Sequence, residues 1–193
     1  MKKIALILVI ALLPYCINAQ TKGYEKSIGV YSNIGVGKYS NTAFGINMIN
    51  GYRFNDYFYA GIGIGVSYHS GISSVFINKR TFQNDIFRKD SYPVPIYAHL
   101  RTDLSKSGVR PFLTFNAGYT IDLNRHAPGL MLEPAFGVEI PINVKQSILL
   151  SVGFNLQRHK YYYSYQGLEI TDWESSDKEE LFKAIAVKAA IKF

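Results

Sequence analysis

Four histidines are the side chains that most directly suggest catalysis or metal binding in this chain. His69 and Ser70 are sequence neighbours, and neighbouring residues of a strand point to opposite faces, so this pair does not supply a base and a nucleophile for one site. His126 falls in a predicted loop and His159 at a strand end, and neither lies at triad spacing from an acidic residue. Because these three and His99 are scattered, we predict no catalytic residue, no metal ligand and no cofactor.

A second set of chemically active residues carries charges of both signs at equivalent positions of an alternating pattern. In each of these segments, apolar residues alternate with small or polar ones, and the charged residue lies on the same face as the small and polar residues. The set contains Arg53, His99, Arg101, Asp103, Arg110, Glu133, Glu139, Lys188 and Lys192. Because an unpaired buried charge costs several kcal/mol, we expect these residues to pair inside a narrow tube. We predict that Glu139 pairs with Arg101 or Arg110, and that Glu133 pairs with Lys188.

Eight alternating segments would position these charges. They cover roughly 26–39, 44–54, 58–68, 92–103, 110–122, 130–140, 148–157 and 181–193. In the last segment, for example, Ile185, Val187 and Ile191 alternate with Ala186 and Lys188. A period of two with one apolar face predicts strands. Asn50 interrupts the apolar face of the second segment, and we expect either a β-bulge or an exception to the alternation there.

The links between these segments are sorted by length. The short links are 55–56, 105–108 and 143–147. The longer links are 70–91, 123–129 and 160–180, and only the link near Ser40 breaks the rule. Counted from a periplasmic N-terminus, the short links fall on the periplasmic side and the longer ones outside. The pattern predicts an all-β fold, an eight-stranded antiparallel up-and-down transmembrane β-barrel with short periplasmic turns and longer extracellular loops.

The first residues have the pattern of an export signal. Two lysines precede an apolar run at 4–13, and Ala19 provides a small residue at the cleavage point. The run is much shorter than the roughly 20 residues that cross a bilayer as a helix, so we do not expect a helical anchor. We therefore assign 1–19 to a cleaved signal peptide and 20–193 to the barrel domain.

The composition narrows the function classes. The formal charge is +7, but the basic residues do not gather on one helix or loop, so we do not expect binding to nucleic acid. A soluble barrel of the lipocalin type also alternates, but it would turn its apolar face inward around a ligand. The polar alternation here is rich in glycine and in charges of both signs, which favours a barrel with an apolar exterior and a polar lumen.

Some stretches of the chain are similar to a known family. They are Tyr92–Arg101 (YPVPIYAHLR), Arg110–Phe112, Ala117–Tyr119 and the terminal Phe193 on the apolar strand face. In these features the chain resembles the small outer-membrane β-barrels of Gram-negative bacteria, the OmpA/OmpX type, and the porin-family barrels of Bacteroidetes. The resemblance implies the cell outer membrane as location and Phe193 as the C-terminal signal for barrel assembly. It implies no substrate, because eight strands leave an interior just wide enough for side chains to fill.

These observations predict a monomeric, non-enzymatic barrel whose lumen is plugged by paired charges and whose role is structural or adhesive. A narrow small-solute channel and a lipid A-modifying enzyme at the outer rim stay open as alternatives. The expected partners are outer-membrane lipids and lipopolysaccharide, the barrel-assembly machinery, and a surface protein or glycan. The outer loops would contact that surface partner through Phe76, Phe82, Phe87, Tyr163, Tyr165 and Trp173. The sequence favours a protruding hairpin at 71–91 and an interfacial aromatic girdle at 161–163.

Overall fold

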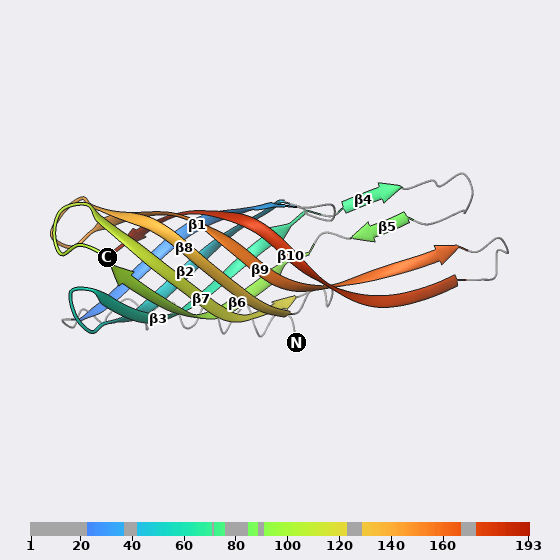
Figure 1. The fold of residues 1–193 in the computed structure, drawn as a ribbon, viewed down its shortest axis with the longest axis horizontal. Helices are drawn as coiled ribbons and strands as arrows, with labels where there is room; N and C mark the ends of the chain where they lie inside the picture. The colour runs from blue at the N-terminus through green and yellow to red at the C-terminus, as the bar shows by residue number, and fades with distance from the viewer. Residues whose placement is uncertain are drawn as a thin grey trace.

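The computed structural model describes residues 23–36, 42–70, 72–75, 85–88, 91–122, 129–166 and 173–193, in ten strands. The strands are β1 (Tyr24–Gly35), β2 (Thr42–Arg53), β3 (Phe58–His69), β4 (Ile72–Val75), β5 (Asp85–Arg88), β6 (Pro93–Asp103), β7 (Arg110–Asp122), β8 (Gly129–Pro141), β9 (Ser147–Gln166) and β10 (Trp173–Lys192). Eight of them close a barrel in the order β1-β10-β9-β8-β7-β6-β3-β2, while β4 and β5 pair only with each other (Figure 1). All of the pairings are antiparallel.

The alternation of the sequence becomes an outer and an inner surface. Ile62 on β3 points outward and is 67% exposed, whereas Tyr59 on the same strand points into the lumen and is 4% exposed. The outward positions hold large apolar side chains on every barrel strand, as a barrel wall in contact with lipid requires. The predicted fold class, an eight-stranded up-and-down transmembrane barrel, is therefore confirmed. Among the residues described, no helix is long and apolar enough to cross a membrane.

Glycines on the inner surface make room for aromatic rings of neighbouring strands. A Cβ atom at Gly63 would lie 2.2 Å from the ring of Tyr97, its register partner on β6. A Cβ atom at Gly45 would likewise lie 2.5 Å from the ring of Tyr31 on β1. The glycine-rich inner faces thus allow large rings to lie flat against the wall of a narrow barrel.

The short links and the C-terminus lie at the same end of the barrel (Figure 1). In the turn between β2 and β3, Asn55 Oδ1 accepts the backbone N–H groups of Tyr57 and Phe58 at 2.9 and 2.8 Å. In the turn between β8 and β9, Asn143 Oδ1 accepts those of two following residues at 2.9 and 2.8 Å. Side-chain oxygens that replace backbone acceptors in this way stabilise tight turns. We call this end the turn side.

Two ribbons extend from the opposite end of the barrel. β10 pairs with β1 only as far as the Gly35–Ala184 pair, and β9 pairs with β8 only as far as Met131–Gln157. Beyond these pairs, β9 and β10 continue together to Gln166 and Trp173, and β4–β5 forms a second hairpin (Figure 1). The predicted link 160–180 is longer than the short turns, and the strands extend into it, because residues 160–166 and 173–180 are paired strand that continues β9 and β10 beyond 157 and 181.

At Asn50 the structure shows an exception to the alternation and not a bulge. The register runs without interruption through this residue, which pairs with Lys26 on β1 and with Ile62 on β3. Asn50 stays on the outward parity, and its Oδ1 is buried without a hydrogen-bond partner among the described residues. The first barrel strand begins at Tyr24, two residues earlier than the alternation indicated.

Candidate functional site

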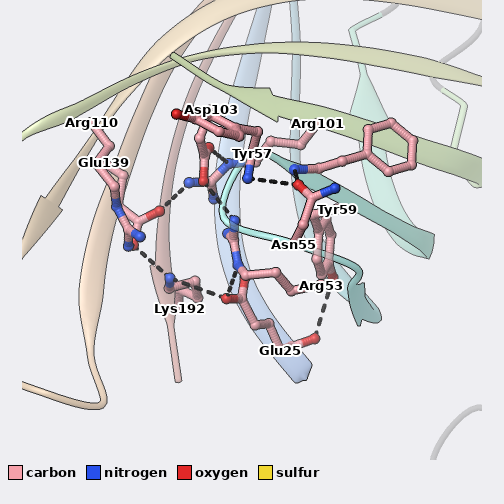
Figure 2. Close-up of polar contacts among 11 residues, drawn as sticks. Glu25, Arg53, Asn55, Tyr57, Tyr59, Arg101, Asp103, Arg110, Glu139 and Lys192 are labelled. Atoms are coloured by element: carbon pink, nitrogen blue, oxygen red, sulfur yellow. Dashed lines mark hydrogen bonds and ion pairs between the residues drawn. The ribbon is translucent and has the colours of Figure 1, made fainter. Parts of the chain in front are cut away.

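Polar side chains that point into the lumen form the candidate site, and they gather at two levels. The turn-side cluster consists of Glu25, Arg53, Arg101, Asp103, Arg110, Glu139 and Lys192, which lie at strand ends next to the short turns (Figure 2). The central cluster consists of His99, Asn116, Glu133, Asn155 and Lys188, which lie further along the strands. The turn-side cluster draws residues from both sides of the β1–β10 junction, whereas the central cluster comes from the neighbouring strands β6 to β10.

Glu139 is the most enclosed acid of the turn-side cluster. Its carboxylate accepts hydrogen bonds from the guanidinium groups of Arg101 and Arg110 and lies 2.5 Å from the Lys192 ammonium. The side chain of Glu139 has no exposed surface, while that of Arg101 is 3% exposed. Three cations thus surround one buried carboxylate, which compensates for removing it from water.

A second chain of ion pairs continues from Arg101 across the lumen (Figure 2). Arg101 Nε donates to Asp103 at 2.6 Å, and Arg53 Nη1 donates to the other oxygen of Asp103 at 2.8 Å. Arg53 also binds Glu25 in a bidentate manner, through Nε at 2.5 Å and Nη2 at 3.0 Å. Lys192 lies 3.6 Å from Glu25 and so joins the two ends of the network. Such forked contacts are among the strongest hydrogen bonds in proteins.

The central cluster is built around the Glu133 carboxylate. Lys188 lies 2.5 Å from it, and the amide groups of Asn116 and Asn155 donate to it at 2.9 and 3.2 Å. Because the amide nitrogen of Asn116 is used in this way, its oxygen is the acceptor for His99 Nδ1 at 2.6 Å, which places the proton on Nδ1. Glu133 therefore has an amide partner on each of the two strands that flank β8, in addition to the Lys188 ammonium.

Aromatic rings close the space around the Lys188 ammonium. Its Nζ lies 5.2 Å from the ring centroid of Tyr31 and 5.8 Å from that of Tyr97, both within cation–π range. The Tyr97 hydroxyl accepts a hydrogen bond from Asn47 Nδ2 at 2.8 Å. The ammonium is thus held by one carboxylate and two rings at mid-lumen.

Little empty volume is left in the lumen between and above the clusters. A cavity of about 50 Å³ lies between them and is lined by residues that include Tyr59, His99 and Lys192. A smaller cavity of about 10 Å³ lies beyond Glu133 and is lined by residues that include Thr120 and Gln157. Since one water molecule needs roughly 10–15 Å³, these spaces suit a few water molecules.

The structure brings all nine sequence-predicted charged or titratable residues into these two clusters. Glu139 contacts both predicted arginines, and Glu133 contacts Lys188. Sequence reasoning missed Glu25, which lies two residues before the inward-facing Ser27 and therefore on the same face of β1. Starting the first strand earlier would have included it. It also missed Asn116 and Asn155, neutral residues whose binding role no charge pattern reveals.

The residues predicted to contact a surface partner lie in the ribbons or outside the described residues. Phe87 belongs to β5, Tyr163 and Tyr165 to β9, and Trp173 begins β10. Phe76, Phe82 and the loop histidine His126 lie outside the described residues. The predicted girdle at 161–163 falls on the part of β9 that pairs only with β10.

Of the histidines outside the two clusters, His69 is the one whose side chain is described. His69 is 2% exposed and faces the lumen, and the adjacent Ser70 hydroxyl donates to the backbone oxygen of Thr42 at 3.1 Å. In the part of the chain that the structure describes, no three His, Cys, Asp or Glu residues gather as metal ligands.

Comparison with solved structures finds barrels of the same architecture. The outer-membrane protein OprG from Pseudomonas aeruginosa superimposes with a TM-score of 0.62 at 12% identity, covering 89% of this chain and 96% of that one. Neisserial surface protein A (NspA) superimposes with a TM-score of 0.51, also at 12% identity and covering 89% and 96%. No protein-family model and no curated protein sequence matches. At this identity the comparison establishes that the chain has the fold of small eight-stranded outer-membrane barrels.

Proposed function

We propose that this chain is an outer-membrane barrel with a closed lumen that acts at the cell surface through its ribbons. The outward apolar band supports a location in lipid, and the solved barrels that share the fold support the outer membrane. Export would follow cleavage of a signal peptide after Ala19. N-terminal sequencing of the protein purified from outer membranes tests this step, and the expected first residue is Gln20.

Closure of the lumen is the first part of the proposal. A conducting pore needs a continuous water-filled path, whereas the spaces beside the two clusters are cavities of about 50 and 10 Å³. The Lys188–Glu133 pair lies between them, beside the rings of Tyr31 and Tyr97. We infer that the ion pairs act as a plug and that the charged lumen stabilises the barrel instead of passing solutes.

The single observation that carries the surface role is the continuation of β9 and β10 beyond the barrel. Each strand has 20 residues, whereas the other barrel strands have 11 to 13. Beyond Lys183, whose backbone oxygen accepts the N–H of Val36, no described strand pairs with the β1-facing edge of β10, so this edge can receive an added strand. The neighbouring hairpin contacts β9 through β5. We infer that the ribbon binds a surface protein or glycan.

Two deletions test this role while leaving the barrel intact. Removing residues 161–178 and joining the ends with Asn-Gly should keep heat-modifiable gel migration, outer-membrane fractionation and the lumenal ion pairs, because the deleted rungs pair only with each other. Attachment of the cells to host-protein or glycan surfaces should fall. Removing residues 73–88 tests the β4–β5 hairpin in the same assay. Unchanged attachment in both deletions would contradict a surface role of the ribbons.

We also infer that the role is not catalytic. The support is that His69 is enclosed in the lumen and that the adjacent Ser70 hydroxyl is directed to a backbone oxygen of β2. Mass spectra of lipid A from cells that overexpress the protein test this inference. A new lipid A species that depends on the protein would contradict it.

A further inference from the structure

The outward surface of the barrel carries a few charges, and all of them have the same sign. On the described outward positions between the short turns and the start of the ribbons, the exposed charged residues are Arg158 and Lys183, whereas Lys26 is buried at 7% exposure. Both exposed residues are basic, and no acidic residue occurs at those positions. The lumen, in contrast, mixes both signs at close distance. The exposed charge on the described outer surface of the barrel is therefore positive.

Arg158 and Lys183 lie next to one another at the end of the barrel opposite the short turns. Arg158 on β9 pairs with Leu181, and Lys183 on β10 pairs with Leu156, so the two basic residues occupy diagonal positions of one strand pair. Both alternate with outward apolar residues, and both side chains are exposed. Diagonal neighbours on one face of an antiparallel pair are within reach of long side chains.

The position of this pair relates to the apolar band. The preceding outward residues of the same strands are apolar, with Phe154 38% and Ile185 41% exposed. The barrel beyond the two basic residues gives way to the ribbon, whose strands no longer pair with β1 or β8. Arg158 and Lys183 thus mark the level where the hydrocarbon layer ends and lipid headgroups begin.

We propose that Arg158 and Lys183 form a binding site for the phosphate groups of the glycolipid in the outer leaflet of the membrane. A guanidinium binds phosphate oxygens in a forked geometry, and an ammonium adds a second point charge. The apolar residues below the pair contact the acyl chains of the same lipid. The proposal rests on the outer-membrane location, because that end of the barrel then faces the phosphorylated glycolipid.

The binding is tested with the full barrel refolded in a lipid-free neutral detergent and titrated with purified lipid A. Wild type should bind bisphosphorylated lipid A more tightly than enzymatically dephosphorylated lipid A. The variants Arg158→Gln and Lys183→Gln should each weaken binding roughly fivefold, as expected for the loss of one basic residue at a charged lipid surface. The matched control is Lys145→Gln, which removes an exposed lysine from a short turn at the other end and should leave the affinity unchanged.

Three outcomes would overturn the proposal. They are equal affinity for the dephosphorylated lipid, unchanged affinity in both variants, or equal binding of phosphatidylglycerol, which would assign the site to any phosphate lipid. Heat-modifiable migration of each variant shows that a loss of binding does not come from misfolding. Cell fractionation separately tests the location, so a protein found outside the outer membrane would contradict the proposed function without changing the measured affinities.

Discussion

The ring of Tyr97 covers Gly63 on the neighbouring strand, and the Tyr97 hydroxyl reaches across two strands to the Asn47 amide. The ring leaves no space for a β-carbon at Gly63, which would lie 2.2 Å away. A glycine on the inner surface thus makes room for a ring that fills part of the lumen beside the Lys188 ammonium.

A side chain at Gly63 should destabilise the barrel. We expect Gly63→Ala to lower the free energy of unfolding by about 1–3 kcal/mol, since the ring is held by its hydrogen bond and must shift. Urea unfolding of the refolded barrel, followed by far-ultraviolet circular dichroism or gel migration, measures this change. The control Ala98→Val enlarges an outward residue of β6 and should have little effect. A variant Gly63→Ala with wild-type stability would show that the ring moves freely.

Neutralising Glu139 should be more costly than neutralising a surface acid. Glu139→Gln leaves Arg101, Arg110 and Lys192 around a neutral group, and we expect a loss of about 3–5 kcal/mol in the free energy of unfolding. The matched control is Asp56→Asn. Asp56 pairs with Lys106 on the surface, where the Asp56 side chain is 69% exposed and the Lys106 side chain 60%. That change should stay within about 1 kcal/mol. Similar losses in the two variants would contradict the importance of burial.

The plug predicts a low conductance that rises when the central cluster is removed. Wild-type barrels in planar bilayers should show no large, steady current, whereas the double variant Glu133→Ala/Lys188→Ala should conduct several-fold more. The double change keeps the net charge and replaces both partners, so it enlarges the lumen without leaving an unpaired charge. A large steady current in the wild type would contradict the plug and favour the small-solute channel.

The backbone pairing of Phe193 and its predicted role as an assembly signal can be tested separately. Backbone hydrogen bonds join Phe193 to Lys26 at 3.0 and 2.9 Å and form the last rung between β10 and β1. Phe193→Ala keeps that rung, so stability after refolding in detergent should stay within about 1 kcal/mol of wild type. If the aromatic side chain is read during assembly, the amount of folded barrel in cells should still fall several-fold, as measured by gel migration of outer-membrane fractions. Equal amounts of folded wild-type and variant barrel in cells would show that the Phe193 side chain is not an assembly signal.

The period of two predicts the strands, and the charges and glycines of the polar alternation decide which face looks into the lumen. Residues such as Glu133 and Lys188 could then be assigned to the lumen by parity, since a slip of one residue would turn the apolar face inward and the charges toward lipid. The length of β9 and β10 could not be predicted in this way. Outside the membrane both faces of a ribbon meet water, so tyrosines at 161–163 and acidic residues at 177–180 obscure the alternation.

The contacts within the lumen were less accessible to sequence reasoning than the lumen itself. Parity places Arg101 inside, but whether it binds Asp103, Glu139 or both depends on the stagger between strands, which the sequence does not state. Glu25 was missed because the turn before the first strand has no clear signal. At Asn50 the sequence left two outcomes open, a bulge or an exception to the alternation, and only the strand register could decide between them.

The position of Lys192 has a consequence for the seam that closes the barrel. Its ammonium binds Glu139 of β8 and lies near Glu25 of β1, although the strand that carries it is hydrogen-bonded to β1 and β9 and not to β8. One side chain therefore ties both flanks of the junction between the first and the last barrel strand, so this junction does not depend on backbone pairing alone.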